Sequence, residues 1–211
     1  RLPAPGQTCI TRRGNPTNTR RTRQKMPTSV EWGGPLWQAR RNRAVTLQTA
    51  RPHAADLRDS YLGVLDCQEP VYKTSRDARW PDLYNSESNT PPRLSLERLP
   101  YESLAQPFSE FVHEVKKIMP EALTQAARAL DTGNLTVNAE VLQKTALQQP
   151  FSASIQSVQL EVTALQFFGR AFLEPIVEAI AHHQDRPLHQ SAATVCPFCN
   201  WPPQFATLQD E

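Results

Sequence analysis

Apolar residues recur at helical spacing from Leu36 onward, and prolines and glycines divide the pattern into separate segments. Residues three and four positions apart share one face of a helix, so this spacing predicts amphipathic helices rather than strands. The predicted helices cover residues 36–50, 52–70, 101–115, 120–133, 138–148 and 155–181. The same pattern gives no convincing strand before residue 190.

Prolines mark several of the predicted breaks. Pro70 is expected to end or kink the second helix, because a proline inside a helix removes a hydrogen bond and clashes with the preceding turn. For the same reason, Pro175 is expected to kink or interrupt the last helix after Glu174. Residues 74–100 are polar and rich in proline, so they predict a long loop with little regular structure.

The segment 155–181 has the widest apolar face of the chain. Its two adjoining stripes are Ile155, Val158, Val162, Leu165, Phe168 and Phe172, and Leu160, Ala164, Phe167 and Ala171. So wide a face predicts a central helix that other helices cover on several sides. The predicted fold class is therefore mainly α, with a bundle-like helical domain.

Composition supports helices and excludes several classes of protein. The chain has 19 prolines and only 7 glycines among 211 residues, which argues against a turn-rich β fold and against glycine-rich phosphate loops. No apolar run approaches the roughly 18 residues of a membrane span. Four cysteines are too few for a secreted disulfide scaffold, so a reducing cytoplasm is the expected location.

The net charge of +2 conceals a strong asymmetry along the chain. Residues 1–43 contain ten basic side chains and a single acid, Glu31, so the rest of the chain carries an excess of acids. Residues 1–33 show no apolar period and are predicted to be a disordered basic tail. The predicted organisation is this tail, an all-α domain over residues 34–190, and a partial metal-binding knuckle over residues 191–211.

The basic tail has four interpretations. It could bind nucleic acid through counterion release, or it could be a solvated extension without a specific role. A twin-arginine export signal would need an apolar stretch after the arginines, and residues 22–29 are polar. An organelle transit peptide would need an amphipathic apolar stripe, which the tail lacks. The solvated extension is the preferred interpretation.

The motif that carries chemistry is the Cys-Pro-Phe-Cys turn formed by Cys196 and Cys199. Two cysteines at this spacing can bind one metal ion from a tight turn, or they can form a redox disulfide. The redox site would need a helix after the turn, and Pro202 and Pro203 would stop such a helix within one turn. The preferred interpretation is a partial rubredoxin-like or zinc-ribbon knuckle for iron or zinc.

A tetrahedral ion needs two ligands beyond Cys196 and Cys199. No second C-x-x-C pair is present, and the candidates for completion are His182, His183, His189, Cys67 and Cys9. The alternative is a pair of free thiols in a frayed tail.

Other constellations are missing from the sequence. There is no G-x-S-x-G, no G-x-G-x-x-G and no P-loop. His113 and Glu114 begin like the zinc motif H-E-x-x-H, but Lys117 stands where the second histidine would be. His113 is therefore expected to be an ordinary helix-surface residue, and no catalytic residue is predicted.

The folded part resembles the family of formate dehydrogenase accessory proteins. The segments that suggest the resemblance are Arg51-Pro-His-Ala-Ala-Asp-Leu-Arg, Leu99-Pro-Tyr-Glu-Ser-Leu, Phe172-Leu-Glu-Pro and Cys196-Pro-Phe-Cys-x-x-x-Pro. Their order covers residues 36–211 and leaves out the basic tail. Asn200 stands where the family often has glycine.

The resemblance implies a cytoplasmic assembly factor that binds the catalytic subunit of formate dehydrogenase before its export and that binds iron. Cys196 and Cys199 would match the first cysteine pair of the family's ribbon region, with the chain truncated after it. A complete metal site would then need a homodimer or further residues. The alternative hypothesis is a nucleic-acid-binding protein that uses the basic tail and a zinc knuckle.

Overall fold

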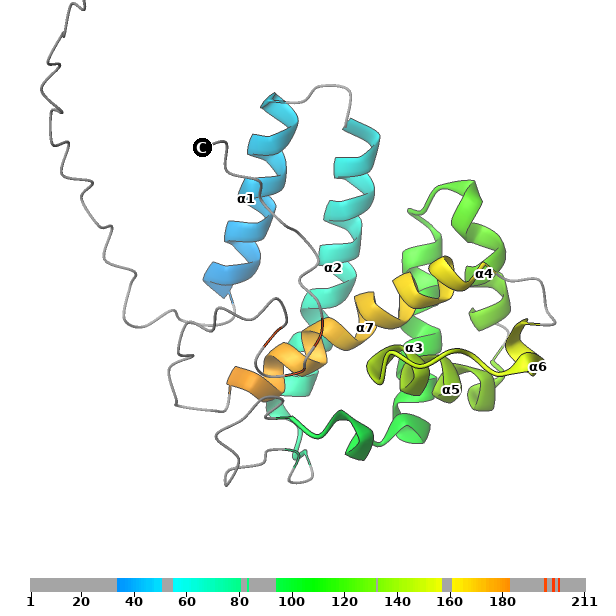
Figure 1. Cartoon of the computed structure of the whole chain (residues 1–211). Coiled ribbons are helices and arrows are strands. Elements are labelled where there is room, and N and C mark those ends of the chain that lie inside the picture. Colours follow the sequence, from blue (N-terminus) through cyan, green and yellow to red (C-terminus); the bar gives the residue numbers. More distant parts are fainter. Residues whose placement is uncertain are drawn as a thin grey trace, which may run out of the picture. The chain divides into compact units, whose positions relative to one another are not determined.

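The computed structural model describes residues 34–50, 55–80, 83, 94–131, 133–156, 161–182, 196, 199 and 201, all within the unit Glu31–Glu211. These residues form seven α-helices and one 3₁₀ helix, and they contain no β-strand (Figure 1). The mainly α fold predicted from the hydrophobic pattern is confirmed. The predicted basic tail, residues 1–33, and most of the predicted knuckle lie outside the described residues.

The helices follow the predicted order along the chain. Their bounds are α1 Gly34–Ala50, α2 Ala55–Asp77, η2 Leu96–Arg98, α3 Tyr101–Lys116, α4 Glu121–Asp131, α5 Leu135–Ala146, α6 Ala153–Gln156 and α7 Val162–His182. Among the described residues, no helix is both long enough and apolar enough to cross a lipid bilayer.

Neither of the two prolines that were expected to break or kink a helix interrupts it. α2 runs through Pro70 as far as Asp77, and α7 runs through Pro175 to His182. The Pro70 side chain is exposed, so the carbonyl that loses its partner near it can turn toward water. Around Pro175 the helix is held by packing, because Leu173, Ile176 and Val177 are all buried. Tertiary packing outweighs the local penalty of the proline there.

The predicted loop over residues 74–100 is more ordered than expected. Its first four residues belong to α2, and η2 lies near its end. Leu83, Leu94, Leu96 and Leu99 are buried, and the Tyr101 hydroxyl donates a hydrogen bond of 2.6 Å to the Leu96 carbonyl oxygen. The described part of this segment therefore contributes side chains to the core.

The starts of α5 and of the last helix differ from the prediction for local reasons. α5 begins at Leu135 rather than at residue 138, because the Asn134 side chain accepts a hydrogen bond of 3.1 Å from the Val137 amide and caps the helix. The last helix begins at Val162, while Ile155 belongs to the separate short helix α6. The spacing of apolar residues continues from α6 into α7, so the sequence pattern alone could not show that two separate helices are present.

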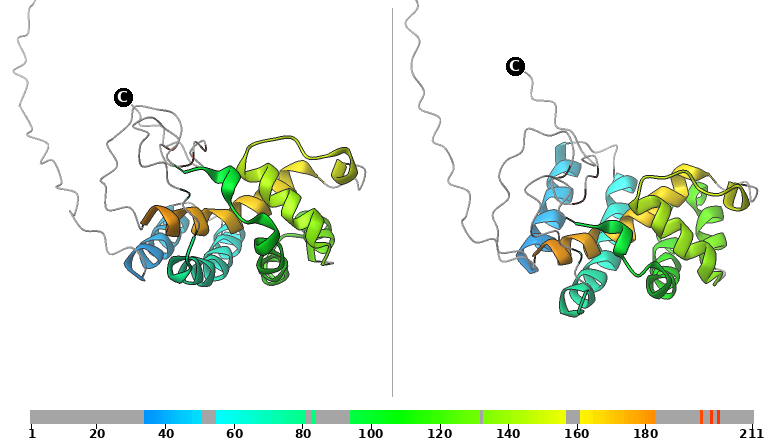
Figure 2. Two further views of the ribbon diagram at one scale, coloured as in Figure 1. Left: turned by 90° about the horizontal axis from the view of Figure 1, so that it is seen from below. Right: turned by 60° about the horizontal axis from the view of Figure 1, so that its bottom comes forward.

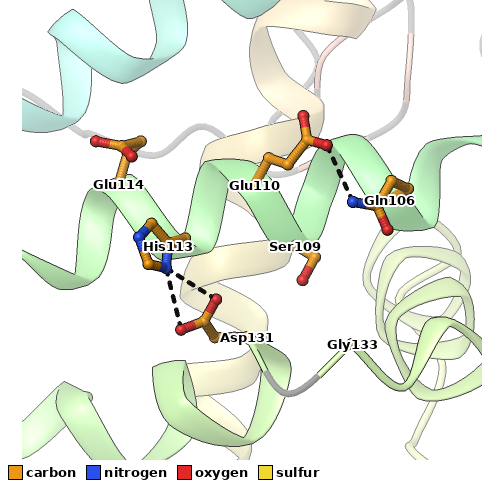
Figure 3. Close-up of a pocket in the computed structure, with 7 residues that line it drawn as sticks. All are labelled: Gln106, Ser109, Glu110, His113, Glu114, Asp131 and Gly133. Atoms are coloured by element: carbon orange, nitrogen blue, oxygen red, sulfur yellow. Dashed lines mark hydrogen bonds and ion pairs between the residues drawn. The ribbon is translucent and has the colours of Figure 1, made fainter.

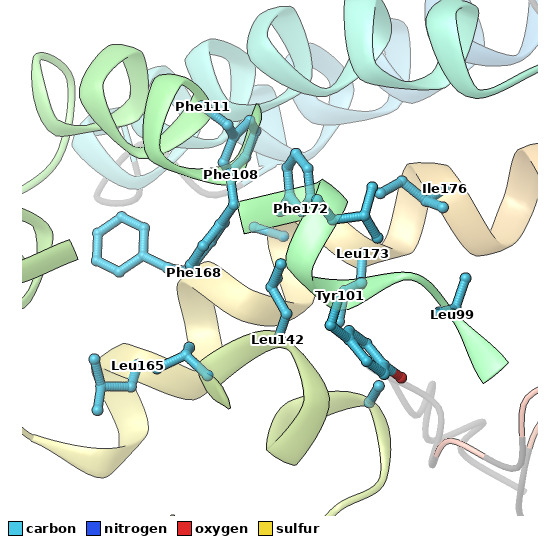
Figure 4. Close-up of a cluster of buried hydrophobic side chains, with 14 of the residues drawn as sticks. Leu99, Tyr101, Phe108, Phe111, Leu142, Leu165, Phe168, Phe172, Leu173 and Ile176 are labelled. Atoms are coloured by element: carbon cyan, nitrogen blue, oxygen red, sulfur yellow. The ribbon is translucent and has the colours of Figure 1, made fainter. Parts of the chain in front are cut away.

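α7 is the central helix, as its wide apolar face predicted. It packs against α2 and α5 and makes smaller contacts with α3 and α4, and Figure 2 shows it running across its neighbours. Phe172 lies at the middle of the core, with ring centroids 5.3 Å from Phe108 and 5.5 Å from Phe111 (Figure 4). The Phe172 side chain is only 1% exposed, so this aromatic cluster is dry and tightly packed.

α5 and α7 approach closely at Gly169. A Cβ at this position would lie 2.6 Å from Thr145 Oγ1 and 3.0 Å from Thr145 Cβ. We predict that Gly169→Ala lowers the free energy of unfolding by about 1–3 kcal/mol, because the two helices would be forced apart. Chemical denaturation of the purified chain measures this change.

Gly63→Ala is the matched control. Its Cβ would meet only the Ile118 side chain, which is 38% exposed and can move away. The variant should be neutral, or more stable by up to about 1 kcal/mol through its higher helix propensity. An equal loss in the free energy of unfolding in both variants would contradict the close approach of α5 and α7 at Gly169.

Candidate functional site

The C-terminal cysteine turn is closed by its own backbone. The Cys196 amide donates a hydrogen bond of 2.8 Å to the Trp201 carbonyl oxygen, and Cys199 lies in a turn between them. Cys196 is half-buried and Cys199 is buried. The two predicted metal ligands are therefore brought together on one short turn.

The two thiols of the turn are joined by a side-chain hydrogen bond. The hydrogen bond with the Cys196 thiol, followed by burial, raises the pKa of Cys199 far above its usual range, while the backbone amides of Trp201 and Cys199 act in the opposite direction. Cys199 is accordingly held in its neutral thiol form. A metal ion at this turn would have to displace the proton, so its binding would strengthen as the pH rises.

Trp201 attaches the turn to the helical domain. Its indole N–H donates a hydrogen bond of 2.8 Å to the carbonyl oxygen of Ala146, the last residue of α5. Carbonyl groups at a helix end have no partner within the helix, so this bond caps α5. Cys199 and Trp201 are 8% and 7% exposed and belong to the same core cluster as α3, α5 and α7. The turn is thus packed as part of the helical core.

The rest of a metal ligand set is not found in the part of the chain that the structure describes. No three or more His, Cys, Asp or Glu side chains lie close enough there to hold an ion. Cys67 is half-buried on α2, where burial raises the pKa of its thiol. Cys9, His183 and His189 lie outside the described residues, and so does the side chain of His182, the last residue of α7.

The donor chemistry of the turn nevertheless suits a metal ion. Thiolates prefer zinc and iron, and a C-x-x-C turn supplies two of the four ligands of a tetrahedral site. Cys196 and Cys199 would hold the ion, and two more ligands would have to come from elsewhere.

A second candidate site lies between α3 and α4. A surface pocket of about 380 Å³ is lined by Gln106, Ser109, Glu110, His113, Glu114, Asp131 and Gly133 (Figure 3). His113 is half-exposed, and its Nδ1 lies 3.1 Å from Asp131 Oδ1. Lys116 also pairs with Asp131, and these two contacts, Lys116 first, lower the pKa of the Asp131 carboxyl group.

The pocket contains a histidine and a carboxylate that could act as a general base, but its serine is not placed as a nucleophile. A carboxylate on Nδ1 orients the His113 ring, as in catalytic dyads. The nearby Ser109 hydroxyl instead donates a hydrogen bond of 3.4 Å to the Leu130 carbonyl oxygen. The ion pairs of Asp131 with His113 and Lys116 join the end of α4 to α3, and this structural role accounts for them.

Two of the ten basic side chains in residues 1–43 form ion pairs with acidic side chains of the helical domain. Arg40 pairs with Glu178 at 2.6 Å, and Arg41 pairs with Asp66 and Glu69, each at 2.7 Å. These contacts reduce the positive charge that the first helix could offer to a nucleic acid.

Sequence reasoning missed three features of these sites. The His113–Asp131 pair spans 18 positions, and no local pattern signals it. The pairing of Arg40 and Arg41 with acids of α2 and α7 depends on tertiary packing in the same way. Trp201 did leave a signal, because a tryptophan directly after a cysteine turn in a polar segment needs a place to be buried.

Comparisons of the chain with protein-family models, with curated proteins and with solved structures gave no match.

The docking of the cysteine turn predicts a specific cost for losing the indole N–H. We expect Trp201→Phe to lower the free energy of unfolding by about 1–3 kcal/mol, because the buried Ala146 carbonyl group loses its partner. Trp80→Phe is the control: the Trp80 indole donates to the Ser75 carbonyl oxygen at a half-buried position, so the loss should be smaller. A Trp201→Phe chain with wild-type stability in urea denaturation would argue against the docked turn.

Proposed function

We propose that this chain is an accessory protein for the assembly of formate dehydrogenase, which binds the catalytic subunit in the cytoplasm before export. The proposal rests on the resemblance of its segments to that family, in the order of helices followed by a cysteine turn. It describes a binding protein without turnover of a small molecule.

The observation that carries the proposal is the attachment of the cysteine turn to the helices. Trp201 caps α5, and Cys199 is buried against the core, so the two parts that the resemblance requires are packed together. A free thiol pair in a frayed tail would not explain a buried tryptophan beside it.

The metal belongs to the same proposal. Cys196 and Cys199 would hold iron or zinc, and a second copy of the chain or residues outside the described ones would supply the remaining ligands. The ion would fix the geometry of the turn and strengthen its closure. The helices would supply the surface that meets the catalytic subunit.

Co-purification tests the proposed function. We expect the tagged full-length chain to retain the catalytic subunit of formate dehydrogenase from cells that express both proteins. Cys67→Ser, on α2 and outside the turn, should retain the catalytic subunit as the wild-type chain does. The double variant Cys196→Ser/Cys199→Ser should lose bound iron or zinc, measured by elemental analysis.

The controls separate the two parts of the proposal. An unrelated cytoplasmic enzyme carrying the same tag should not retain the catalytic subunit. If the full-length wild-type chain also fails to retain it, the proposed function is wrong. If the metal content of the double variant equals that of the wild-type chain, the assignment of Cys196 and Cys199 as ligands is wrong.

A further inference from the structure

α1 rests on a small cluster that is separate from the main core. Trp37 of α1 packs against Leu65 and Tyr72 of α2 and Ala179 of α7, with the Trp37 and Tyr72 ring centroids 5.9 Å apart. Around this cluster, α2 and α7 present acidic side chains to α1. We call the receiving surface the α1 seat, which consists of Leu65, Asp66, Glu69, Tyr72, Glu178 and Ala179.

The α1 seat binds two consecutive arginines. Arg40 Nη2 lies 2.6 Å from Glu178 Oε1, and its guanidinium carbon lies 4.6 Å from the centroid of the Trp37 ring. Arg41 bridges Asp66 and Glu69. The seat therefore binds a short sequence pattern, in which a large aromatic residue is followed three and four positions later by arginines.

α1 does not satisfy the polar groups of the seat. Two of its buried polar atoms, the Tyr72 hydroxyl and Glu178 Oε2, have no hydrogen-bond partner among the described residues. Tyr72 is fully buried, so its hydroxyl group carries its full desolvation cost. Arg40 reaches only one oxygen of Glu178, although a guanidinium can bind both oxygens of a carboxylate at once.

Few other contacts are made by the described side chains of α1, those of residues 37–46. Of its side chains that the structure describes, only Trp37 and Ala44 are buried. The pair of Arg41 with Asp66 is exposed and contributes little to stability, whereas the pairs of Arg40 with Glu178 and of Arg41 with Glu69 are partly buried. Elements held by few buried contacts open more readily than the rest of a protein.

From these contacts we propose that the α1 seat is a binding site for a helical segment of a partner protein that carries an aromatic residue and a pair of arginines. α1 covers this site in the free protein and is displaced by the segment. A guanidinium placed to bind both Glu178 oxygens, and a polar group that reaches the Tyr72 hydroxyl, would make the bonds that α1 leaves unmade. The inference goes beyond the proposed function, because it names the chemistry of the bound segment whatever the partner is.

The test uses the α1 sequence itself as the probe. A fluorescently labelled peptide of residues 34–50 is titrated with the full-length chain, and binding is followed by fluorescence anisotropy. Trp37→Ala should bind the peptide at least about ten-fold more tightly than the wild-type chain, because its own α1 competes less well for the seat. Binding should weaken as the salt concentration rises.

Variants of the seat and of the peptide identify the contact. In the Trp37→Ala chain, adding Glu69→Gln and Glu178→Gln should weaken peptide binding by about ten-fold or more. Glu102→Gln, an exposed carboxylate of α3 outside the seat, is the matched control and should leave the affinity unchanged. A peptide with Arg40→Glu and Arg41→Glu should not bind.

Three outcomes would overturn the proposal. The first is that neither the wild-type chain nor the Trp37→Ala chain binds the peptide. The second is binding that the seat substitutions leave unchanged. The third is a Trp37→Ala chain that forms dimers in sedimentation, with the seat filled by α1 of a second copy.

Hydrogen exchange of the wild-type chain provides a measurement that needs no variant. Amides of α1 should exchange faster than those of α7 through local opening. If α1 and α7 exchange equally slowly, α1 is not displaceable and the proposal is wrong. These experiments contain no formate dehydrogenase, so their failure is distinct from a failure of the proposed function.

Discussion

The packing of Phe172 against Phe108 and Phe111 is the contact on which the arrangement of the helices depends. It fixes α7 against α3 at the middle of the core, where aromatic side chains bury a large apolar area. α7 then has to meet α2 on one side and α5 on the other. Because α7 is surrounded, its position determines the positions of the helices that cover it.

Both surfaces with a proposed role follow from the position of α7. Gly169 lets α5 approach closely, and the end of α5 offers the Ala146 carbonyl group that holds Trp201 and the cysteine turn. Farther along α7, Glu178 and Ala179 form one side of the α1 seat. A displacement of α7 would therefore change the support of the cysteine turn and the seat of α1 together.

The sequence predicted what depends on local spacing. The amphipathic period predicted the helices and the central place of the last one, and the start of α3 at Tyr101 is confirmed. Pro70 and Pro175 were misleading as helix ends, because packing and solvent access around them are tertiary properties. The Cys196–Cys199 pair could be recognised from its spacing. The ion pairs of Arg40 and Arg41 could not, since they join residues that are far apart in sequence.

Comparing Phe172→Ala with Phe167→Ala in chemical denaturation tests the central role of α7 most directly. Phe172 is 1% exposed, whereas Phe167, on the same helix, is 36% exposed. Phe172→Ala should lower the free energy of unfolding by about 3–5 kcal/mol. Phe167→Ala should lower it by less than about 1 kcal/mol. Similar losses in the two variants, or a Phe172→Ala chain as stable as the wild type, would contradict this account of the fold.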